Sequence, residues 1–444
     1  MAAWKLPAEL ASWVVQMSGV LDVRVAWRLL PLLVGALFGQ GRQTVASWLR
    51  GGELGDDFRL YYYFLGSLGR NVKSVAGVLF RIAVRVIAPG DRLLLALDDT
   101  ATKRQGPLVE GAGIHHNPTP GAADNKFLYG HVWVTLSWVV RHRWWGTIGL
   151  PLLAMLYVRQ KSMSSLAPWY HVKFQTKLEQ AVALVEWATR ALAGLGKTLW
   201  IVADGAYAKR PFLQGAMALG AVVVSRLRKD AALWSVPETV EPGQRKRGRP
   251  SKYGKDKISL AKRAGHRLGW EFGDFMLYGE KVRKQYKTFL ATYKPVGGLI
   301  RVVLVKEAHG WYAYFCTKPD ASVGEILEAV ADRAAIEQNF HDLKEVHGAG
   351  KQQVRNYWAN IAAYHVTLWW HTLIEVWAWH KPHKELSDRS ASPWDDATRR
   401  PSHADRRNAL RRQCLENEFR REESASGIPR KFRRLWKRLM KLVA

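Results

Sequence analysis

The sequence predicts an α/β protein in which a mixed sheet flanked by helices is interrupted by a mostly β insertion. Short apolar runs at residues 92–97, 198–203 and 221–225 are typical of buried strands, and segments with helical periodicity separate them. Residues 226–310 instead alternate polar and aromatic residues, as half-exposed strands do. The 444 residues, 48% hydrophobic and 24% charged, have the composition of a globular protein.

The N-terminal region is expected to be helical. An apolar helix over residues 29–38 and a short helix over 43–50 are joined by a turn that contains glycine. This spacing fits a helix-turn-helix, in which Arg42, Gln43 and Arg50 would reach DNA. Two apolar helices joined by a glycine turn also occur in any helical domain, so both interpretations stay open.

The remaining elements follow from the same periodicities. A long loop that contains glycine and proline is expected between the first strand and residue 125. The expected elements, in order, are helices over 58–68 and 72–86, strands over 92–97, 128–141 and 144–158, a helix over 174–195, a strand over 198–203, a helix over 208–219, a strand over 221–225, and, after the insertion, helices over 323–346 and 358–379.

The charge balance favours a polyanionic partner. Lys and Arg total 67 against 38 Asp and Glu, a net charge of +29, and cations placed on phosphates release condensed counterions. No apolar run reaches the roughly 20 residues that span a bilayer, so no membrane association is expected. The only cysteines, Cys316 and Cys414, form neither a disulfide framework nor a cysteine zinc site, which fits a cytoplasmic protein.

Two aspartates stand at the ends of apolar strand runs. Asp98 and Asp204 would project from the edge of the sheet where open α/β sheets bind their ligands. A single aspartate at such a place usually caps the next turn. Two of them on neighbouring strands of a very basic protein indicate ligands for Mg²⁺ or Mn²⁺, which prefer hard oxygen donors.

The helix expected over residues 323–346 adds a third acid. Arg333, Glu337 and Lys344 are spaced by four and seven residues, so they share a stripe of about 40° on the helix. An adjacent apolar stripe would pack on the sheet and turn these charges toward a crevice. Solvent-exposed charge pairing four residues apart is the alternative that this spacing also allows.

The ordered set ALDDT at residues 96–100, VADGAY at 202–207 and the Arg-x3-Glu-x6-Lys helix resembles the DDE transposases of bacterial insertion sequences. It is most similar to the branch with a Tyr-Arg-Glu-Lys signature and a β-rich insertion, over roughly residues 90–350. The resemblance implies an RNase H-like core in which Asp98, Asp204 and Glu337 are the catalytic triad. The triad would hold two Mg²⁺ ions, with Mn²⁺ able to substitute, while Arg333 and Lys344 contact the DNA backbone.

The resemblance also implies an activity and partners. Such an enzyme binds the terminal inverted repeats of its element, cleaves their ends and joins them to target DNA. The expected partner is double-stranded DNA, bound by a homodimer in a synaptic complex in the bacterial cytoplasm at the nucleoid. A catalytically inactive, transposase-derived DNA-binding protein and an RNase H-like repair nuclease are the alternatives.

No nucleotide cofactor is expected, because the P-loop-like residues 191–198 lack the first glycine and follow a helix.

Two positions need comment. Val330 stands where the signature has tyrosine, so that hydroxyl is missing or supplied elsewhere. The choice of Asp98 over Asp99 rests on the Asp-x-Thr pattern of the family and on strand phase, and Asp99 remains the alternative. His365 and His371 lie six residues apart on an aromatic helix, and we interpret them as core or surface residues.

The insertion contains a second segment expected to bind DNA. Its RGRP core resembles an AT-hook, which inserts arginine into narrow A·T-rich minor grooves. The alternative is a basic loop that contacts only phosphates. The cations of this segment are Arg245, Lys246, Arg247, Arg249 and Lys252.

These assignments divide the chain into five regions. We expect an N-terminal helical DNA-binding domain over 1–90, the two parts of the catalytic core over 91–225 and 311–384, the β-rich insertion over 226–310, and a basic helical C-terminal region over 385–444.

Overall fold

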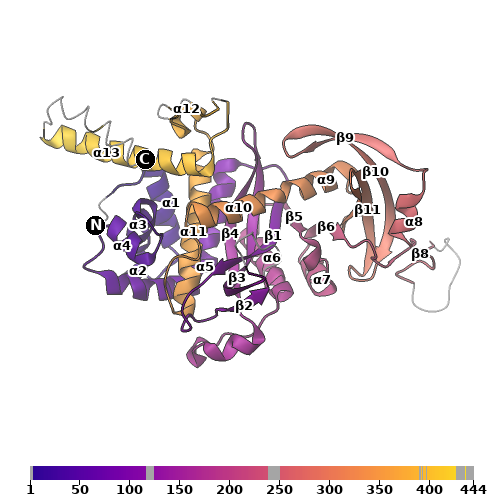
Figure 1. The fold of residues 1–444 in the computed structure, drawn as a ribbon, viewed down its shortest axis with the longest axis horizontal. Coiled ribbons are helices and arrows are strands. Elements are labelled where there is room, and N and C mark those ends of the chain that lie inside the picture. Colours follow the sequence, from indigo (N-terminus) through magenta and orange to yellow (C-terminus); the bar gives the residue numbers. More distant parts are fainter. Residues whose placement is uncertain are drawn as a thin grey trace.

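The computed structural model describes residues 4–116, 125–238, 251–389, 392, 394–396, 398–426 and 436. Its centre is a twelve-stranded mixed sheet with helices on both faces, which confirms the predicted fold class (Figure 1). The strands are β1 (Arg92–Lys103), β2 (Gly113–His116), β3 (Phe127–His142), β4 (Gly146–Tyr157), β5 (Thr198–Ala203), β6 (Val222–Leu227), β7 (Leu233–Trp234), β8 (Lys257–Ile258), β9 (Glu271–Leu277), β10 (Glu280–Tyr293), β11 (Gly298–Glu307) and β12 (Gly310–Cys316).

The helices cover this sheet and extend beyond its edge. They are α1 (Ala8–Ser18), α2 (Val23–Ala26), α3 (Leu29–Phe38), α4 (Val45–Gly51), α5 (Phe58–Ile87), α6 (Lys177–Ala191), α7 (Arg210–Ala218), α8 (Leu260–Gly265), α9 (Val323–Asp332), α10 (Ala334–Glu345), α11 (Tyr357–Ala378), α12 (His383–Leu386) and α13 (His403–Ser426). Within the described ranges, no helix is long and apolar enough to cross a membrane.

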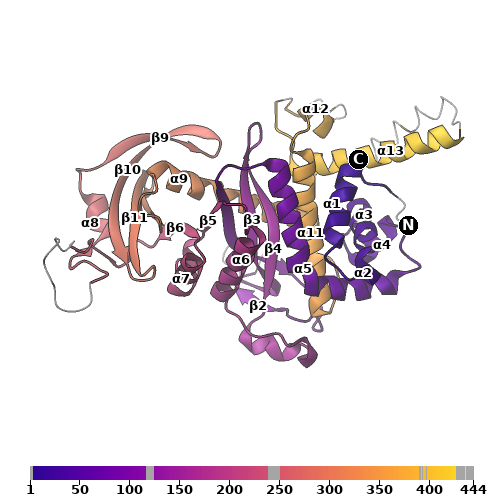
Figure 2. The same cartoon turned by 180° about the vertical axis from the view of Figure 1, so that it is seen from behind.

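The core half of the sheet has the strand order of an RNase H-like fold. β4, β3 and β1 pair antiparallel, and β1, β5 and β6 then run parallel. The side chains of β1 from Leu93 to Leu97 are all buried, because both faces of this strand are covered. α6 and α7 lie over one face of the sheet, which is turned toward the viewer in Figure 2. α9 and α10 lie over the other face.

The insertion continues the same sheet. β12 pairs antiparallel with β6, and β11 and β10 follow in order. The long β10 also pairs with β9, and these strands form the curved end of the molecule that lies farthest from the N-terminal helices (Figure 1). The expected β-rich insertion is therefore an extension of the catalytic sheet by backbone hydrogen bonds.

The N-terminal helices share a core with α11. α5 and α11 cross so closely at Gly69 that a Cβ there would lie 1.9 Å from the backbone oxygen of Trp358. The indole nitrogen of Trp370 donates a hydrogen bond to the carbonyl of Leu33, 2.8 Å away, across to α3. These contacts attach the N-terminal helices to the core, and the proposed domain boundaries remain predictions.

Several elements differ from their expected form. The helix expected over 323–346 is two helices that meet at Arg333, where the Ile336 N–H bonds to the Arg333 carbonyl in a tightened turn. The helices expected over 58–68 and 72–86 are the single helix α5. β1 continues to Lys103 because its second half pairs with β3, and the expected loop after it contains the short strand β2.

Candidate active site

Asp98 and Asp204 lie at the same level of two adjacent strands. β1 and β5 are parallel, and their last paired residues, Leu97 and Ala203, directly precede the two acids. The Asp98 carboxylate accepts a hydrogen bond from the backbone N–H of Asp99 at 2.8 Å. The Asp204 carboxylate accepts one from the N–H of Ala206 at 3.2 Å, where it caps a short 3₁₀ turn. The parallel pairing therefore brings the two predicted carboxylates to one edge of the sheet.

Arg333 connects the late helix to this edge. Its guanidinium contacts the Asp98 carboxylate at 2.8 Å and the Glu337 carboxylate, one turn further along α10, at 3.0 Å. Arg333 is only 23% exposed, whereas Glu337 is 62% exposed and reaches toward solvent. The arginine at the break between α9 and α10 thus holds one acid of the sheet and the acid of the helix together.

The electrostatics of the site are dominated by burial. Burial, aided by the charges of Asp99 and Asp204 and opposed by Arg333 and the Asp99 N–H, raises the pKa of Asp98 to about 6. Ionised Asp98 is therefore costly unless a cation lies nearby. The carboxylate oxygens of Asp98, Asp204 and Glu337 are the type of ligand that Mg²⁺ or Mn²⁺ prefers.

Asp99 points to the opposite face of β1, because successive strand residues alternate. Its carboxylate pairs with the Lys177 ammonium at 2.6 Å and accepts a hydrogen bond from the Tyr207 hydroxyl at 2.9 Å. Burial, followed by the charge of Asp99, raises the pKa of Tyr207. Asp99 thus anchors the start of α6, and the geometry favours Asp98 as the member of the acidic site.

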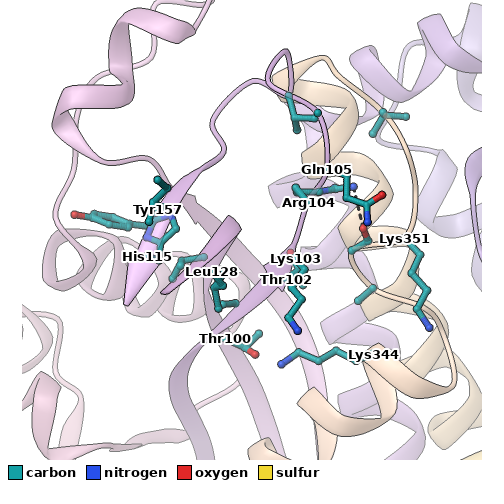
Figure 3. Close-up of a pocket in the computed structure, with 18 of the residues that line it drawn as sticks. Thr100, Thr102, Lys103, Arg104, Gln105, His115, Leu128, Tyr157, Lys344 and Lys351 are labelled. Atoms are coloured by element: carbon teal, nitrogen blue, oxygen red, sulfur yellow. Dashed lines mark hydrogen bonds between the residues drawn. The ribbon is translucent and has the colours of Figure 1, made fainter. Parts of the chain in front are cut away.

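A basic cleft of about 1310 Å³ lies along β1 and the end of α10, and Asp99 lines it, whereas Asp98, Asp204 and Glu337 are not among its lining residues. Lys103 of β1 and Lys344 of α10 point into it near Thr100, and Lys351 lies on its rim (Figure 3). Eight basic side chains line the cleft against two acids, Asp99 and Glu345: Arg42, Lys103, Arg104, Arg159, Lys177, Lys344, Lys351 and Arg355. This charge distribution suits a phosphate backbone.

The cleft contains residues that the sequence did not single out. Arg104 is buried beneath it and bonds to the Asn360 side chain at 2.6 Å, and burial lowers its pKa to about 10. Lys103 was missed because we expected β1 to end at Leu97. The β-branched Thr100 and Thr102, which flank Ala101, were a signal that the strand continues.

The other predicted DNA-binding residues are placed less uniformly. Arg42 lines the cleft, and Arg50 is exposed at the end of α4. The Gln43 side chain donates to the Gly39 carbonyl at 3.0 Å within its own turn. α4 buries four of its seven residues, and the helix-turn-helix interpretation remains a prediction.

The predicted AT-hook-like segment lies mostly beyond the described residues. Lys252 is described and is exposed. Outside the described residues are Arg245, Lys246, Arg247, Arg249 and, except for Trp436, the basic tail over 430–444. Val330 packs partly buried against the core from α9. Both cysteines are free and buried, as expected for a chain without a disulfide framework.

Comparison with protein families finds two overlapping matches. Residues 20–266 match the DDE superfamily endonuclease family, and residues 175–373 match the transposase DDE domain. The first match covers more than half of the chain and includes Asp98 and Asp204, and the second includes Asp204 and Glu337. A comparison with curated proteins finds no match.

Proposed function

Because the chain belongs to the DDE superfamily of endonucleases and transposases, we propose that it is the transposase of an insertion sequence. It binds the terminal inverted repeats of its element, cleaves the DNA at their ends and joins these ends to target DNA. Membership of this family supports a transposase-type nuclease that acts on DNA and uses divalent metals. The observation that carries the finer proposal is that Arg333 joins Asp98 to Glu337 while the pairing of β1 with β5 places Asp204 beside Asp98.

In this proposal the three carboxylates hold two Mg²⁺ ions, which Mn²⁺ can replace. The ions supply activation of a water or DNA 3′-hydroxyl for in-line attack and stabilise charge on the leaving oxygen. Asp98 must be ionised to bind these ions. Because its pKa is raised, its ionisation depends on the cations around it. Arg333 favours the ionised form and keeps Asp98 and Glu337 on the same side of the cleft.

The cleft would position the DNA strand. Lys103 and Lys344 approach each other from the sheet and from the helix that carries Glu337, so a phosphate could bind between them (Figure 3). Arg42 and Lys351 extend the basic surface away from the acids. Arg333 faces the carboxylates, so its contact with DNA backbone is secondary to its role in positioning Asp98 and Glu337.

The test uses purified full-length protein, Mg²⁺ and DNA that carries the terminal repeats of the element. We expect cutting and joining for the wild type, and loss of both with retained repeat binding for Asp98→Asn, Asp204→Asn and Glu337→Gln. Glu416→Gln, an exposed acid on α13 that does not line the cleft, is the control and should stay active. Binding without cutting would favour the inactive DNA-binding protein, and cutting without joining would favour the repair nuclease.

The same experiment addresses assembly. We propose that a homodimer holds two DNA ends in one synaptic complex, in the cytoplasm and close to the nucleoid, and the net charge of +29 supports an association with bulk DNA. Sedimentation of the protein with paired ends should give two chains per two ends. Separate complexes of a single chain with a single end at saturation would contradict the dimer.

A further inference from the structure

A second group of metal-ligating side chains lies away from the three acids. Asp342 of α10, His371 of α11 and His403 of α13 are all buried, and one ligand atom from each lies within 4.8 Å of the others. The three residues come from three helices and are distant in sequence, so they do not form a motif with the spacing of a zinc site. The interpretation of His371 as an ordinary core residue does not explain this clustering.

His403 is oriented as a metal-binding histidine usually is. Its Nδ1 bonds to the Glu375 carboxylate at 2.5 Å, and Glu375 is fully buried and receives a further bond from Arg406 at 2.9 Å. With the Nδ1 proton donated to this carboxylate, Nε2 carries a lone pair directed toward the group. A carboxylate behind the imidazole both fixes the tautomer and raises the basicity of the ligand atom.

His347 supplies a fourth nitrogen. Its Nε2 lies 2.8 Å from the Nε2 of His403, and both rings are fully enclosed.

The remaining two ligands have unfinished contacts. The Asp342 carboxylate lies 3.6 Å from Nε2 of His371, and its other oxygen accepts a bond from Gln338 at 2.9 Å. Nδ1 of His371 is buried without a hydrogen-bond partner among the described residues, whereas its Nε2 lies 3.4 Å from the side-chain nitrogen of Asn339. Buried polar atoms are nearly always satisfied, so an unpartnered nitrogen on a ring that stacks 4.0 Å from the His403 ring points to a ligand.

We propose that Asp342, His371 and His403, with His347 completing the shell, bind a structural Zn²⁺ ion. Imidazole with one carboxylate is a ligand set that suits zinc. A tetrahedral ion about 2.1 Å from each donor places the donors about 3.4 Å apart. The side chains close onto it by small rotations, and the His371 and His403 rings, now stacked at 4.0 Å, turn out of parallel.

The proposed ion has a defined structural task. It joins α13 to α11 and to α10, five residues beyond Glu337 on the same helix. The C-terminal helix would then fix the position of the catalytic glutamate. This site differs from the carboxylate site in ligand type and in burial, so the two sites take different metals.

The test measures zinc directly in full-length protein purified without chelator. We expect one zinc per chain by elemental analysis and an X-ray absorption spectrum with only nitrogen and oxygen donors. His403→Ala and His371→Gln should lose the zinc, while His309→Ala, an exposed histidine on the β11–β12 turn, should retain it. Glu375→Gln should weaken zinc affinity by about 10–100-fold.

Two further measurements separate this proposal from the proposed function. Asp98→Asn should abolish cleavage and keep its zinc, so failure of one proposal leaves the other intact. A zinc chelator should lower the melting temperature of the wild type and leave that of His403→Ala unchanged. Wild-type protein that contains no zinc, zinc bound through sulfur, or zinc retained by both histidine variants would overturn the proposal, even where a variant folds poorly.

Discussion

Replacement of Asp98 by asparagine should stabilise the protein at alkaline pH while it abolishes cleavage. The pKa of Asp98 rises from 3.8 to about 6 on folding. At about 1.36 kcal/mol per unit, the folded state therefore carries a cost of about 3 kcal/mol when this carboxylate is ionised. Asparagine has the shape of the protonated acid and carries no charge, so the variant avoids that cost.

The pH dependence of this effect has a definite sign. A raised folded-state pKa contributes stability at low pH that is lost as pH rises through the folded value. The wild type should therefore match the variant near pH 4 and fall behind it between about pH 4 and 7. With an unfolding entropy of roughly 2.1 cal/mol/K per residue over 444 residues, the gap at pH 8 is about 3 °C.

The assay is thermal unfolding of wild type, Asp98→Asn and Asp99→Asn at pH 4 and pH 8, without added Mg²⁺. Asp99→Asn is the matched control of opposite sign, because it removes the ion pair with Lys177 and should destabilise the protein at pH 8. Added Mg²⁺ should narrow the gap between wild type and Asp98→Asn. A variant that melts below the wild type at pH 8, or gains equally at both pH values, would refute the reasoning.

Three further outcomes are expected. Arg333→Gln should move the acid limb of the cleavage pH profile upward by about one to two units, since a hydrogen bond to a charged group contributes about 1.5–3 kcal/mol; an unchanged profile would show that Arg333 does not act on Asp98. In a filter-binding titration, DNA affinity should fall about 10³-fold or more between 50 and 200 mM salt, and the decrease of affinity with salt should be less steep for Lys351→Gln. An affinity that does not depend on salt would contradict DNA binding in the cleft. Gly69→Ala should destabilise the fold by about 3 kcal/mol or more, because the added methyl group would collide with the backbone of Trp358. Gly66→Ala is the control, because a methyl group there meets nothing within 4 Å. Equal melting temperatures of the two variants would exclude a close helix crossing.

The acids could be predicted from the sequence because strand order follows from local patterns. The apolar runs before Asp98 and Asp204 identify two buried strands, and parallel pairing then brings their ends together. The spacing of Arg333 and Glu337 likewise encodes a shared helix face. The resemblance to DDE transposases, which the family matches confirm, supplied the role of this set.

Other features depend on contacts that no local pattern encodes. The continuation of β1 to Lys103 comes from pairing with β3, which overrides the polar character of Asp98 and Asp99. The burial of Val45, Trp48 and Leu49 of α4 likewise comes from tertiary packing, which spacing alone does not reveal. The meeting of His371 and His403 needs the C-terminal helix to return to α11, and nothing near either residue signals that return.

The continuous sheet limits how the protein can adapt to DNA. Four backbone pairs between β6 and β12, from Val224–Cys316 to Leu227–Ala313, join the insertion rigidly to the strands beside Asp204. A swing of the insertion relative to the acids would break this ladder, so the separation between the two parts is fixed. If the insertion contacts DNA as predicted, a duplex that touches both parts has to follow the path that this rigid arrangement sets. How easily the end sequences deform would then help to decide which DNA is cut, even at base pairs that the protein never contacts.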